Sequence, residues 1–239
     1  MINAIERGNY KLVQRIINKG NDVNRRYVFK DNRENIYLYP LLFALEEKQN
    51  DIARLLVESG ANVNIRDEAQ KTTPLMKAVD NEDVVMVKYL LEKGAHADIA
   101  FFRDNSIDEH VLCNAVYIKD DAIFRLLLEH GANPNLVDEH TNSILMKCVE
   151  RSSISKVRLL LKHKCHVNYR NCKGETAFQL ASWKNNISTL LLEHGADIHI
   201  KDYRMFRRQD KFTKRYETTI LLCSIFHQDI VCTLLPYIY

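Results

Sequence analysis

The segment Leu55-Leu56-Val57-Glu58-Ser59-Gly60-Ala61-Asn62-Val63-Asn64 recurs, with small changes, along this chain of 239 residues. Other copies are Leu90-Leu91-Glu92-Lys93-Gly94-Ala95, Leu127-Leu128-Glu129-His130-Gly131-Ala132-Asn133-Pro134-Asn135 and Leu191-Leu192-Glu193-His194-Gly195-Ala196-Asp197. In each copy a Leu-rich run meets a glycine, which can adopt the left-handed conformation that ends a helix without a Cβ penalty. The segment therefore predicts where a helix ends in each copy.

A small residue precedes each closing glycine by a nearly fixed interval. The small residues are Ala4, Ala44, Ala78, Ala115, Cys148, Ala181 and Ser224, and the glycines are Gly20, Gly60, Gly94, Gly131 and Gly195. In the first four pairs the two residues are sixteen positions apart. Because the whole pattern repeats with a period in the low thirties or longer, we predict a stacked repeat array in which no repeat buries its apolar face alone.

Each repeat is expected to contain two helices. Apolar residues lie four apart before the glycine, as in Leu12/Ile16, Ile52/Leu56, Met86/Leu90, Ile123/Leu127, Ile187/Leu191 and Ile230/Leu234, which is helical spacing. Thr73-Pro74 suits the start of the other helix, since proline needs no N–H in the first turn. The small residue then lets the two helices pack closely.

The residues around the small position resemble a known family. They read Tyr39-Pro40-Leu41-Leu42-Phe43-Ala44, Thr73-Pro74-Leu75-Met76-Lys77-Ala78, Val111-Leu112-Cys113-Asn114-Ala115 and Thr176-Ala177-Phe178-Gln179-Leu180-Ala181. They are similar to the Thr-Pro-Leu-His-x-Ala motif of ankyrin repeats. The resemblance implies an all-α ankyrin-repeat solenoid of helix-turn-helix units with short β-hairpin fingers, with about six full repeats and a terminal seventh. We predict one domain over residues 1–239, with approximate repeats at 1–24, 25–66, 67–100, 101–137, 138–170, 171–200 and 201–239.

No enzyme motif is found in the sequence. Five of only seven glycines are used as helix ends, and the chain has no Gly-rich phosphate loop, G-x-S-x-G or H-E-x-x-H motif. It also has no N-terminal apolar run after a basic start and no apolar run long enough to cross a membrane. We expect a non-enzymatic protein without a cofactor or membrane partner, located in the cytoplasm or also in the nucleus.

Cysteines in this chain could form disulfides or bind a metal. Cys148 occupies a small-residue position, and Cys113 and Cys223 lie in apolar first-helix segments, so they are expected to be free thiols in the core. A second set, His163, Cys165, His166 and Cys172, has zinc-type donors, but its spacing fits no paired zinc motif. We predict no metal site.

Three intervals between small residues are longer by four or more than the 33 positions found twice between Ala115 and Ala181. They are 40 from Ala4 to Ala44, 37 from Ala78 to Ala115 and 43 from Ala181 to Ser224. In an ankyrin fold this interval contains the β-hairpin finger, so the added residues are expected to lengthen fingers or loops. Insertions in repeat proteins often lie on the binding face.

Two of these insertions are basic and aromatic. Residues 201–218 hold seven Lys or Arg and three Asp or Glu, a local net charge of +4 in a chain of +3, which leaves the remainder near neutral. The insertion after Gly20 repeats the theme with Arg25, Arg26, Lys30 and Arg33 beside Tyr27, Phe29, Tyr37 and Tyr39. The predicted partner-binding residues are Arg25, Arg26, Tyr27, Phe29, Tyr203, Arg204, Phe206, Arg207, Arg208, Lys211, Phe212, Lys214 and Arg215.

Three interpretations of these residues remain open. Arg and Tyr are typical of interface hot spots, which favours a docking surface for an acidic protein. Nucleic acid is second, because basic residues with aromatics can follow a phosphate backbone, but the near-neutral remainder argues against it. The third is a solvated loop or a nuclear-localisation signal.

The resemblance implies a scaffold that docks a partner protein on a concave face and extended fingers. Its roles would be sequestering inhibitor, adaptor, or viral or bacterial effector. The alternatives are the regulatory module of a larger enzyme or channel and the substrate receptor of a ubiquitin ligase. The last repeat is unusually apolar for an outer cap, with Ile225, Phe226, Ile230, Leu234 and Tyr237, so we expect self-association through it or fraying.

Overall fold

The structure is a computed structural model that describes residues 1–31, 34–67, 71–98, 100–103, 106–138, 140–181 and 186–197. Its contacts divide the chain into two units, Met1–Asn133 (unit 1) and Pro134–Tyr239 (unit 2), which are described separately below. The predicted seventh repeat lies outside the described residues.

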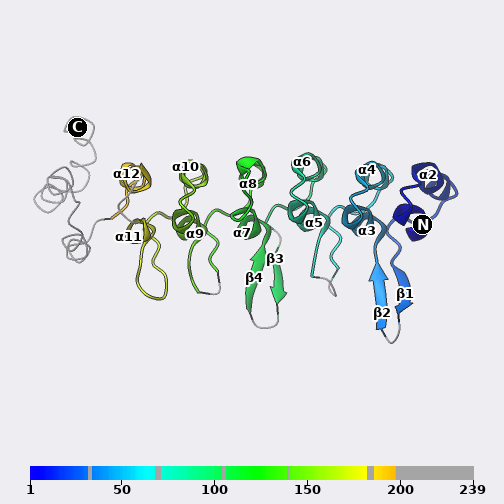
Figure 1. Ribbon diagram of the computed structural model, residues 1–239, viewed down its shortest axis with the longest axis horizontal. Coiled ribbons are helices and arrows are strands. Elements are labelled where there is room, and N and C mark those ends of the chain that lie inside the picture. The colour runs from blue at the N-terminus through cyan, green and yellow to red at the C-terminus, as the bar shows by residue number, and fades with distance from the viewer. Residues whose placement is uncertain are drawn as a thin grey trace, which may run out of the picture. The chain divides into compact units, whose positions relative to one another are not determined.

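Unit 1 consists of four helix pairs and two β-hairpins. The helix pairs are α1 (Ile2–Glu6) with α2 (Tyr10–Asn18), α3 (Pro40–Glu46) with α4 (Asn50–Glu58), α5 (Pro74–Asp80) with α6 (Val84–Glu92), and α7 (Val111–Ala115) with α8 (Asp121–Glu129). The hairpins are β1 (Tyr27–Asp31) with β2 (Glu34–Leu38), and β3 (Ala100–Arg103) with β4 (Ser106–His110), both antiparallel. Figure 1 shows α4, α6 and α8 in one row and α3, α5 and α7 in a second row, from whose side the hairpins project.

Unit 2 repeats the arrangement with α9 (Ile144–Glu150), α10 (Ile154–Lys162), α11 (Ala177–Leu180) and α12 (Asn186–Glu193). Helices α9 and α10 pack together, as do α11 and α12, and α9 contacts α11 while α10 contacts α12. The described residues therefore contain six helix pairs. A mostly helical fold with short β-hairpins is confirmed, and the lengthened intervals after Ala4 and Ala78 both contain a hairpin, as expected.

The first helix of a repeat begins with the predicted proline or cap. Pro40 and Pro74 lie in the first turn of α3 and α5, and the Thr73 side chain accepts a hydrogen bond from the Met76 N–H. In α11 the Thr176 hydroxyl accepts from the Gln179 N–H while the Gln179 side chain accepts from the Thr176 N–H. Each cap satisfies N–H groups that the helix itself leaves without partners.

The second helix of a repeat ends in a left-handed turn. Gly60 has a φ of +91°, its N–H donates to the Val57 carbonyl, and the next N–H, of Ala61, donates to Leu56. This pair of bonds is the Schellman motif, which closes a helix by satisfying its last carbonyls. The same two bonds recur after α6, α8 and α12, where Gly94, Gly131 and Gly195 have φ values between +84° and +89°. The function of these glycines is thus confirmed.

The first helix closes in the same way, and this gives the small residue a second function. The carbonyls of Ala44 and Ala78 accept hydrogen bonds from the N–H groups of Gln49 and Asp83, five residues later. The intervening turns pass through positive φ at Lys48 (+54°) and Glu82 (+53°). The small residue therefore lies where two helices pack and where the chain reverses.

The predicted apolar pairs of the described helices lie in the core, except in α2, where Ile16 is only half-buried; Ile230 and Leu234 lie outside the described residues. Ile52, Leu56, Met86, Leu90, Ile123 and Leu127 are at most 2% exposed. Leu12, which the spacing predicts to be buried, is 42% exposed, while its neighbour Val13 is fully buried. Leu12 occupies in α2 the position of Ile52 in α4, and in the described residues α2 packs against α1 and α4.

An asparagine clip joins the loops of successive repeats. The Asn64 side chain donates to the Gly94 carbonyl at 2.9 Å and accepts from the His96 N–H at 2.8 Å. Asn24 makes the same two bonds to Gly60 and Asn62, and in unit 2 Asn168 makes them to Gly195 and Asp197. One side chain thus replaces the paired backbone bonds that a strand would supply between the loops.

A test of the left-handed turns is available at Lys164, which takes the place of the closing glycine after α10. Its φ is +57° and its side chain is exposed. Left-handed backbone costs a non-glycine residue about 1–2 kcal/mol, part of which is offset by the greater unfolded-state freedom of glycine. We expect Lys164→Gly to raise the free energy of unfolding by about 0.5–1 kcal/mol, measured by urea denaturation. Gly94→Lys is the reciprocal control, because a Cβ there meets no atom within 4 Å, and it should lower stability. Equal midpoints for the wild type and Lys164→Gly would contradict the assignment.

The clip is tested at Asn64 by two substitutions. Asn64→Asp keeps the oxygen that accepts from the His96 N–H but loses the donor to Gly94, whereas Asn64→Ala loses both bonds. A hydrogen bond contributes about 0.5–1.5 kcal/mol net, so unfolding free energies should decrease in the order wild type, Asp, Ala. An alanine variant as stable as the wild type would show that the clip adds no stability.

Candidate interaction surface

The β1–β2 hairpin is the described finger that carries predicted partner-binding residues. Its register pairs Tyr27 with Leu38 and Val28 with Tyr37, and it leads directly into α3 through Tyr39. Val28 is 52% exposed, and Tyr27, Tyr37 and Tyr39 are half-buried. The finger therefore presents aromatic surface at its base, beside the first helix of its repeat.

Two arginines stack on this aromatic surface. The Arg26 guanidinium carbon lies 4.2 Å from the centre of the Tyr37 ring, and that of Arg25 lies 5.8 Å from the Tyr27 ring. Arg25 is exposed and Arg26 is half-buried. A guanidinium over an aromatic face is attracted by the ring quadrupole and keeps its hydrogen-bond donors at the ring's edge, where a partner can reach them. The two cations are thus held in a defined place before any partner binds.

The structure describes only part of the predicted site. Arg25, Arg26 and Tyr27 lie together at the base of the finger, and Phe29 lies in β1, paired with Ile36 in register. Tyr37, which sequence reasoning noted but did not include in the site, is the ring on which Arg26 stacks. The remaining predicted residues, Tyr203, Arg204, Phe206, Arg207, Arg208, Lys211, Phe212, Lys214 and Arg215, lie outside the described residues.

A second finger, β3–β4, was not included in the predicted site. Its strands pair Ala100 with His110 and Phe101 with Glu109, and the register shifts between Phe101 and Arg103. The signal that could have pointed to it is the interval of 37 residues from Ala78 to Ala115. Unit 1 therefore has two extended fingers on the side of α3, α5 and α7 (Figure 1).

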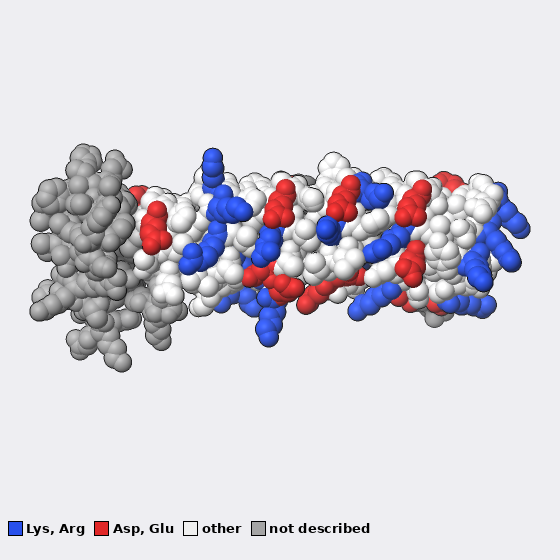
Figure 2. All heavy atoms as spheres, turned by 90° about the horizontal axis from the view of Figure 1, so that it is seen from above, with Lys and Arg blue, Asp and Glu red and all other residues white. Residues whose placement is uncertain are grey.

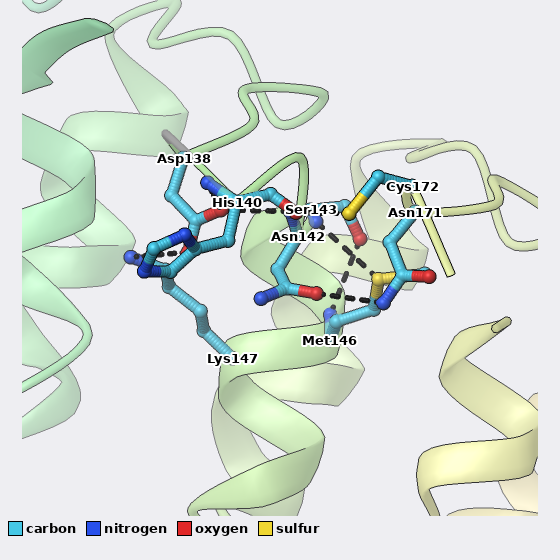
Figure 3. A network of polar contacts seen from close by, with 8 residues as sticks. All are labelled: Asp138, His140, Asn142, Ser143, Met146, Lys147, Asn171 and Cys172. Atoms are coloured by element: carbon cyan, nitrogen blue, oxygen red, sulfur yellow. Dashed lines mark hydrogen bonds and ion pairs between the residues drawn. The ribbon is translucent and has the colours of Figure 1, made fainter. Parts of the chain in front are cut away.

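In unit 2 the loops at the finger position are held by a polar network (Figure 3). The Asp138 carboxylate accepts from the N–H groups of Asn142 (2.7 Å) and His140 (2.9 Å), and it pairs with Lys147 of α9 at 3.1 Å. Asn171 donates to the Asn142 side chain at 2.9 Å, which joins this loop to the loop before α11. The network joins two loops and α9 through hydrogen bonds and one ion pair, so it acts as a structural cross-link.

The electrostatics of Asp138 follow from these contacts. Burial would raise the pKa of its carboxyl group, but the hydrogen bonds from Asn142, Lys147 and His140 and the Lys147 charge outweigh burial, and the pKa is lowered. Both side chains of the ion pair are less than a fifth exposed. The pair is therefore poorly screened by solvent, unlike an ion pair on the open surface.

The residues with zinc-type donors differ in exposure. Cys165 is buried, and burial raises the pKa of its thiol to about 11. Cys172 is exposed, and its thiol lies 3.4 Å from the His140 carbonyl. Within the described part of the chain, no group of three or more His, Cys, Asp or Glu is placed to hold a metal ion. Cys113, Cys148, Cys165 and Cys172 are free thiols.

A shallow, open hollow of about 500 Å³ lies in unit 1 where the loops after α6 and α8 meet. It is lined by Leu91, Gly94, Ala95, His96, Ala97, Asp98, His130 and Gly131. The lining is largely the loop backbone that the clip residues hold in place, so it does not have the enclosed apolar walls typical of a small-molecule site.

Comparison with known proteins agrees with this geometry. The family described as "Ankyrin repeats (3 copies)" matches residues 1–100 and 112–202, which is most of the chain. The chain belongs to the ankyrin-repeat family. Ankyrin repeats form a non-catalytic fold for protein–protein interaction, so this chain contains a protein-interaction module. Among the described residues, no helix has the length and apolar composition required to cross a membrane.

The relatives are viral, cellular and bacterial ankyrin proteins. The ankyrin repeat protein FPV031 of Fowlpox virus (strain NVSL) is 29% identical over 71% of this chain and 48% of its own length. The nuclear factor NF-kappa-B p105 subunit of Gallus gallus is 29% identical over 72% of this chain and 18% of its own. The phosphocholine transferase AnkX of Legionella pneumophila is 23% identical over 64% and 21%. The chain thus spans half or less of the length of each of these relatives.

The polar network of unit 2 gives a pH-dependent prediction. Because the folded-state pKa of Asp138 is lowered, its contribution to stability is present above the unfolded-state pKa of about 4 and is lost as the pH falls through the folded value. We expect Asp138→Asn to lower the free energy of unfolding by about 1–2 kcal/mol at pH 7, with the difference shrinking below about pH 4. Urea denaturation at several pH values measures it. A difference that does not change between pH 7 and pH 3 would show that the carboxylate charge is not responsible.

Proposed function

We propose that this ankyrin array docks a partner protein on the finger side of unit 1, through the β1–β2 finger and the exposed edges of α3 and α5. The observation that carries the proposal is the stacking of Arg26 on Tyr37 at 4.2 Å, next to Arg25 on Tyr27. An arginine fixed on a ring loses little side-chain entropy on binding, which is the property of an interface hot spot.

The neighbouring helices extend the same surface. Phe43 of α3 is half-buried beside the finger, and Lys77 of α5 pairs with Glu46 of α3 at 3.4 Å. These residues continue the mixed aromatic and charged character of the finger base along the first helices. Because Arg25 and Arg26 give the finger base a positive charge, the complementary partner is a protein segment that carries Asp or Glu.

A sequestering or adaptor role follows from a fold that binds and performs no chemistry of its own. The named relatives include a subunit of nuclear factor NF-kappa-B, a viral ankyrin protein and a bacterial transferase, and each of these roles is compatible with a docking surface. We place the protein in the cytoplasm or nucleus. The described cysteines form no disulfide, which is typical of proteins in these reducing compartments.

One observation favours a second candidate, a regulatory module within a larger protein. The chain covers only 21% of AnkX, which is named as a phosphocholine transferase. An ankyrin array of this kind therefore does occur as part of a longer polypeptide that is an enzyme. In that case the finger side would bind another domain of the same polypeptide.

The docking surface is tested by charge reversal at the finger base. Arg25→Glu/Arg26→Glu should weaken binding of a partner captured from host-cell lysate and then purified by tenfold or more, because attraction becomes repulsion at two positions. Tyr37→Ala should weaken it by less, since Arg26 then remains but is no longer held. Isothermal titration calorimetry with the purified partner measures both.

The matched control is Lys11→Glu/Arg15→Glu on α2, which makes the same change in net charge at exposed positions outside the finger. Thermal midpoints should stay within a few degrees for all variants, because exposed substitutions usually alter stability by no more than about 0.5 kcal/mol. Equal affinity of the finger variant and the control would refute the proposed surface.

A further inference from the structure

A second basic region lies in unit 2, away from both predicted insertions. Residues 151–174 contain no Asp or Glu and seven basic residues, which are Arg151, Lys156, Arg158, Lys162, Lys164, Arg170 and Lys173. This local charge of +7 exceeds the +4 of residues 201–218. It does not show in the net charge, because acidic residues elsewhere make the chain outside residues 201–218 near neutral as a whole. The region spans α10 and the loop that follows, so the structure shows which of its cations reach the surface.

Two of the three cations of α10 are exposed, whereas Lys156 is buried. Arg158 and Lys162 are exposed and one helical turn apart, and Lys164 is exposed just beyond the helix. Figure 2 shows Lys and Arg side chains gathered over α10 on this face. Leu159, half-buried beside Arg158, adds a small apolar contact to the stripe. We call Arg158, Leu159, Lys162 and Lys164 the α10 stripe.

The equivalent positions in unit 1 combine opposite charges. Lys162 takes the place of Glu58, Glu92 and Glu129, the last residues of α4, α6 and α8. In α6 the cation one turn earlier, Lys88, pairs with Glu92 at 3.8 Å, and in α4 Arg54 stacks over Tyr89 at 5.4 Å. Within the described part of unit 2, Arg158, Lys162 and Lys164 form no ion pair.

The charge pattern of the α10 stripe is not explained by stability. Like charges four residues apart on a helix are unfavourable by about 0.2–0.5 kcal/mol. The helix dipole favours a cation at the position of Lys162, but it gives no reason for Arg158, which lies before the last turn, or for Lys164, which lies in a strained left-handed turn. An anionic partner that binds outside the helix explains all three residues together.

We propose that the α10 stripe is a second docking surface, separate from the finger, for an acidic segment of a partner protein. The stripe is short, because Glu193 of α12, the counterpart of Lys162 on the next outer helix, is an exposed acid. A long polyanion that continued to α12 would meet this acid, whereas a peptide that spans one repeat would not. Leu159 fits an apolar side chain within such a segment, while the stripe offers no exposed aromatic ring on which a base could stack.

The test is fluorescence anisotropy with the full chain and a labelled peptide in which Glu and Ser alternate around a central Leu. Arg158→Glu/Lys162→Glu should weaken binding of this peptide by at least tenfold, which corresponds to about 1.4 kcal/mol. The matched control is Lys88→Glu/Arg125→Glu, which makes the same charge change at the positions in α6 and α8 that are equivalent to Arg158. It should weaken peptide binding by no more than about twofold, because Glu92 and Glu129 already reduce the positive potential there.

Circular dichroism melting verifies that the variants fold. If Arg158→Glu/Lys162→Glu melts at a lower temperature than the wild type, Arg158→Gln/Lys162→Gln replaces it. This neutral variant should lose an intermediate amount of peptide affinity. Equal losses in the α10 and control variants would overturn the proposal, since binding would then follow net charge alone. A labelled oligothymidylate of equal charge is the second probe. If it binds more tightly than the peptide and loses that affinity in the α10 variant, the occupant is a nucleic acid and the acidic-peptide assignment is wrong.

Discussion

The left-handed turn that ends most of the described helices is the constraint on which the rest of this structure depends. A helix that stops with a residue at positive φ, and with its last carbonyls bonded to the next two N–H groups, must reverse direction at a fixed place. The turn occurs after both helices of a repeat, at Lys48 and Gly60 in one case and at Glu82 and Gly94 in the next. Because the turns are spaced alike, the apolar faces of successive repeats lie in register and bury one another.

Two kinds of hydrogen bond then extend this local closure along the array. Within a repeat, the carbonyl of the small residue accepts the bond that closes the first helix. Between repeats, the side chain of Asn64 or Asn168 holds the next loop by a donor and an acceptor at once. In unit 2 the network around Asp138 and Asn171 adds a third link at the finger position. The residues of the proposed interaction surfaces are not among those that make these hydrogen bonds.

Much of the fold could be predicted from the sequence, because it depends on local patterns. Proline and threonine at helix starts, glycine at helix ends and the fourfold apolar spacing each have a direct physical effect, and the lengths of two repeats indicated the two hairpins.

The burial of Leu12 was predicted wrongly, because burial depends on whether another helix packs against that side of α2. The spacing of apolar residues within one helix does not carry that information. The clip residues Asn24, Asn64 and Asn168 each lie four positions after Gly20, Gly60 or Lys164, but their hydrogen bonds join residues about thirty positions apart. Of the candidate site, Arg25, Arg26 and Tyr27 were predicted, whereas the contact of Arg26 with Tyr37 depends on the hairpin register. The α10 stripe was missed because a net charge averages over regions of opposite sign.

The β1–β2 finger illustrates a separation between folding and specificity. An antiparallel hairpin pairs the inward-facing backbone groups of its two strands with each other, from Tyr27 with Leu38 to Asp31 with Glu34, so its own pairing does not require hydrogen bonds from the helices beneath it. Residues can therefore be added to or removed from such a hairpin in pairs while the helices below keep their packing. An engineer could graft fingers of other lengths or sequences onto α3, and thereby redirect binding, without redesigning the core that supports them.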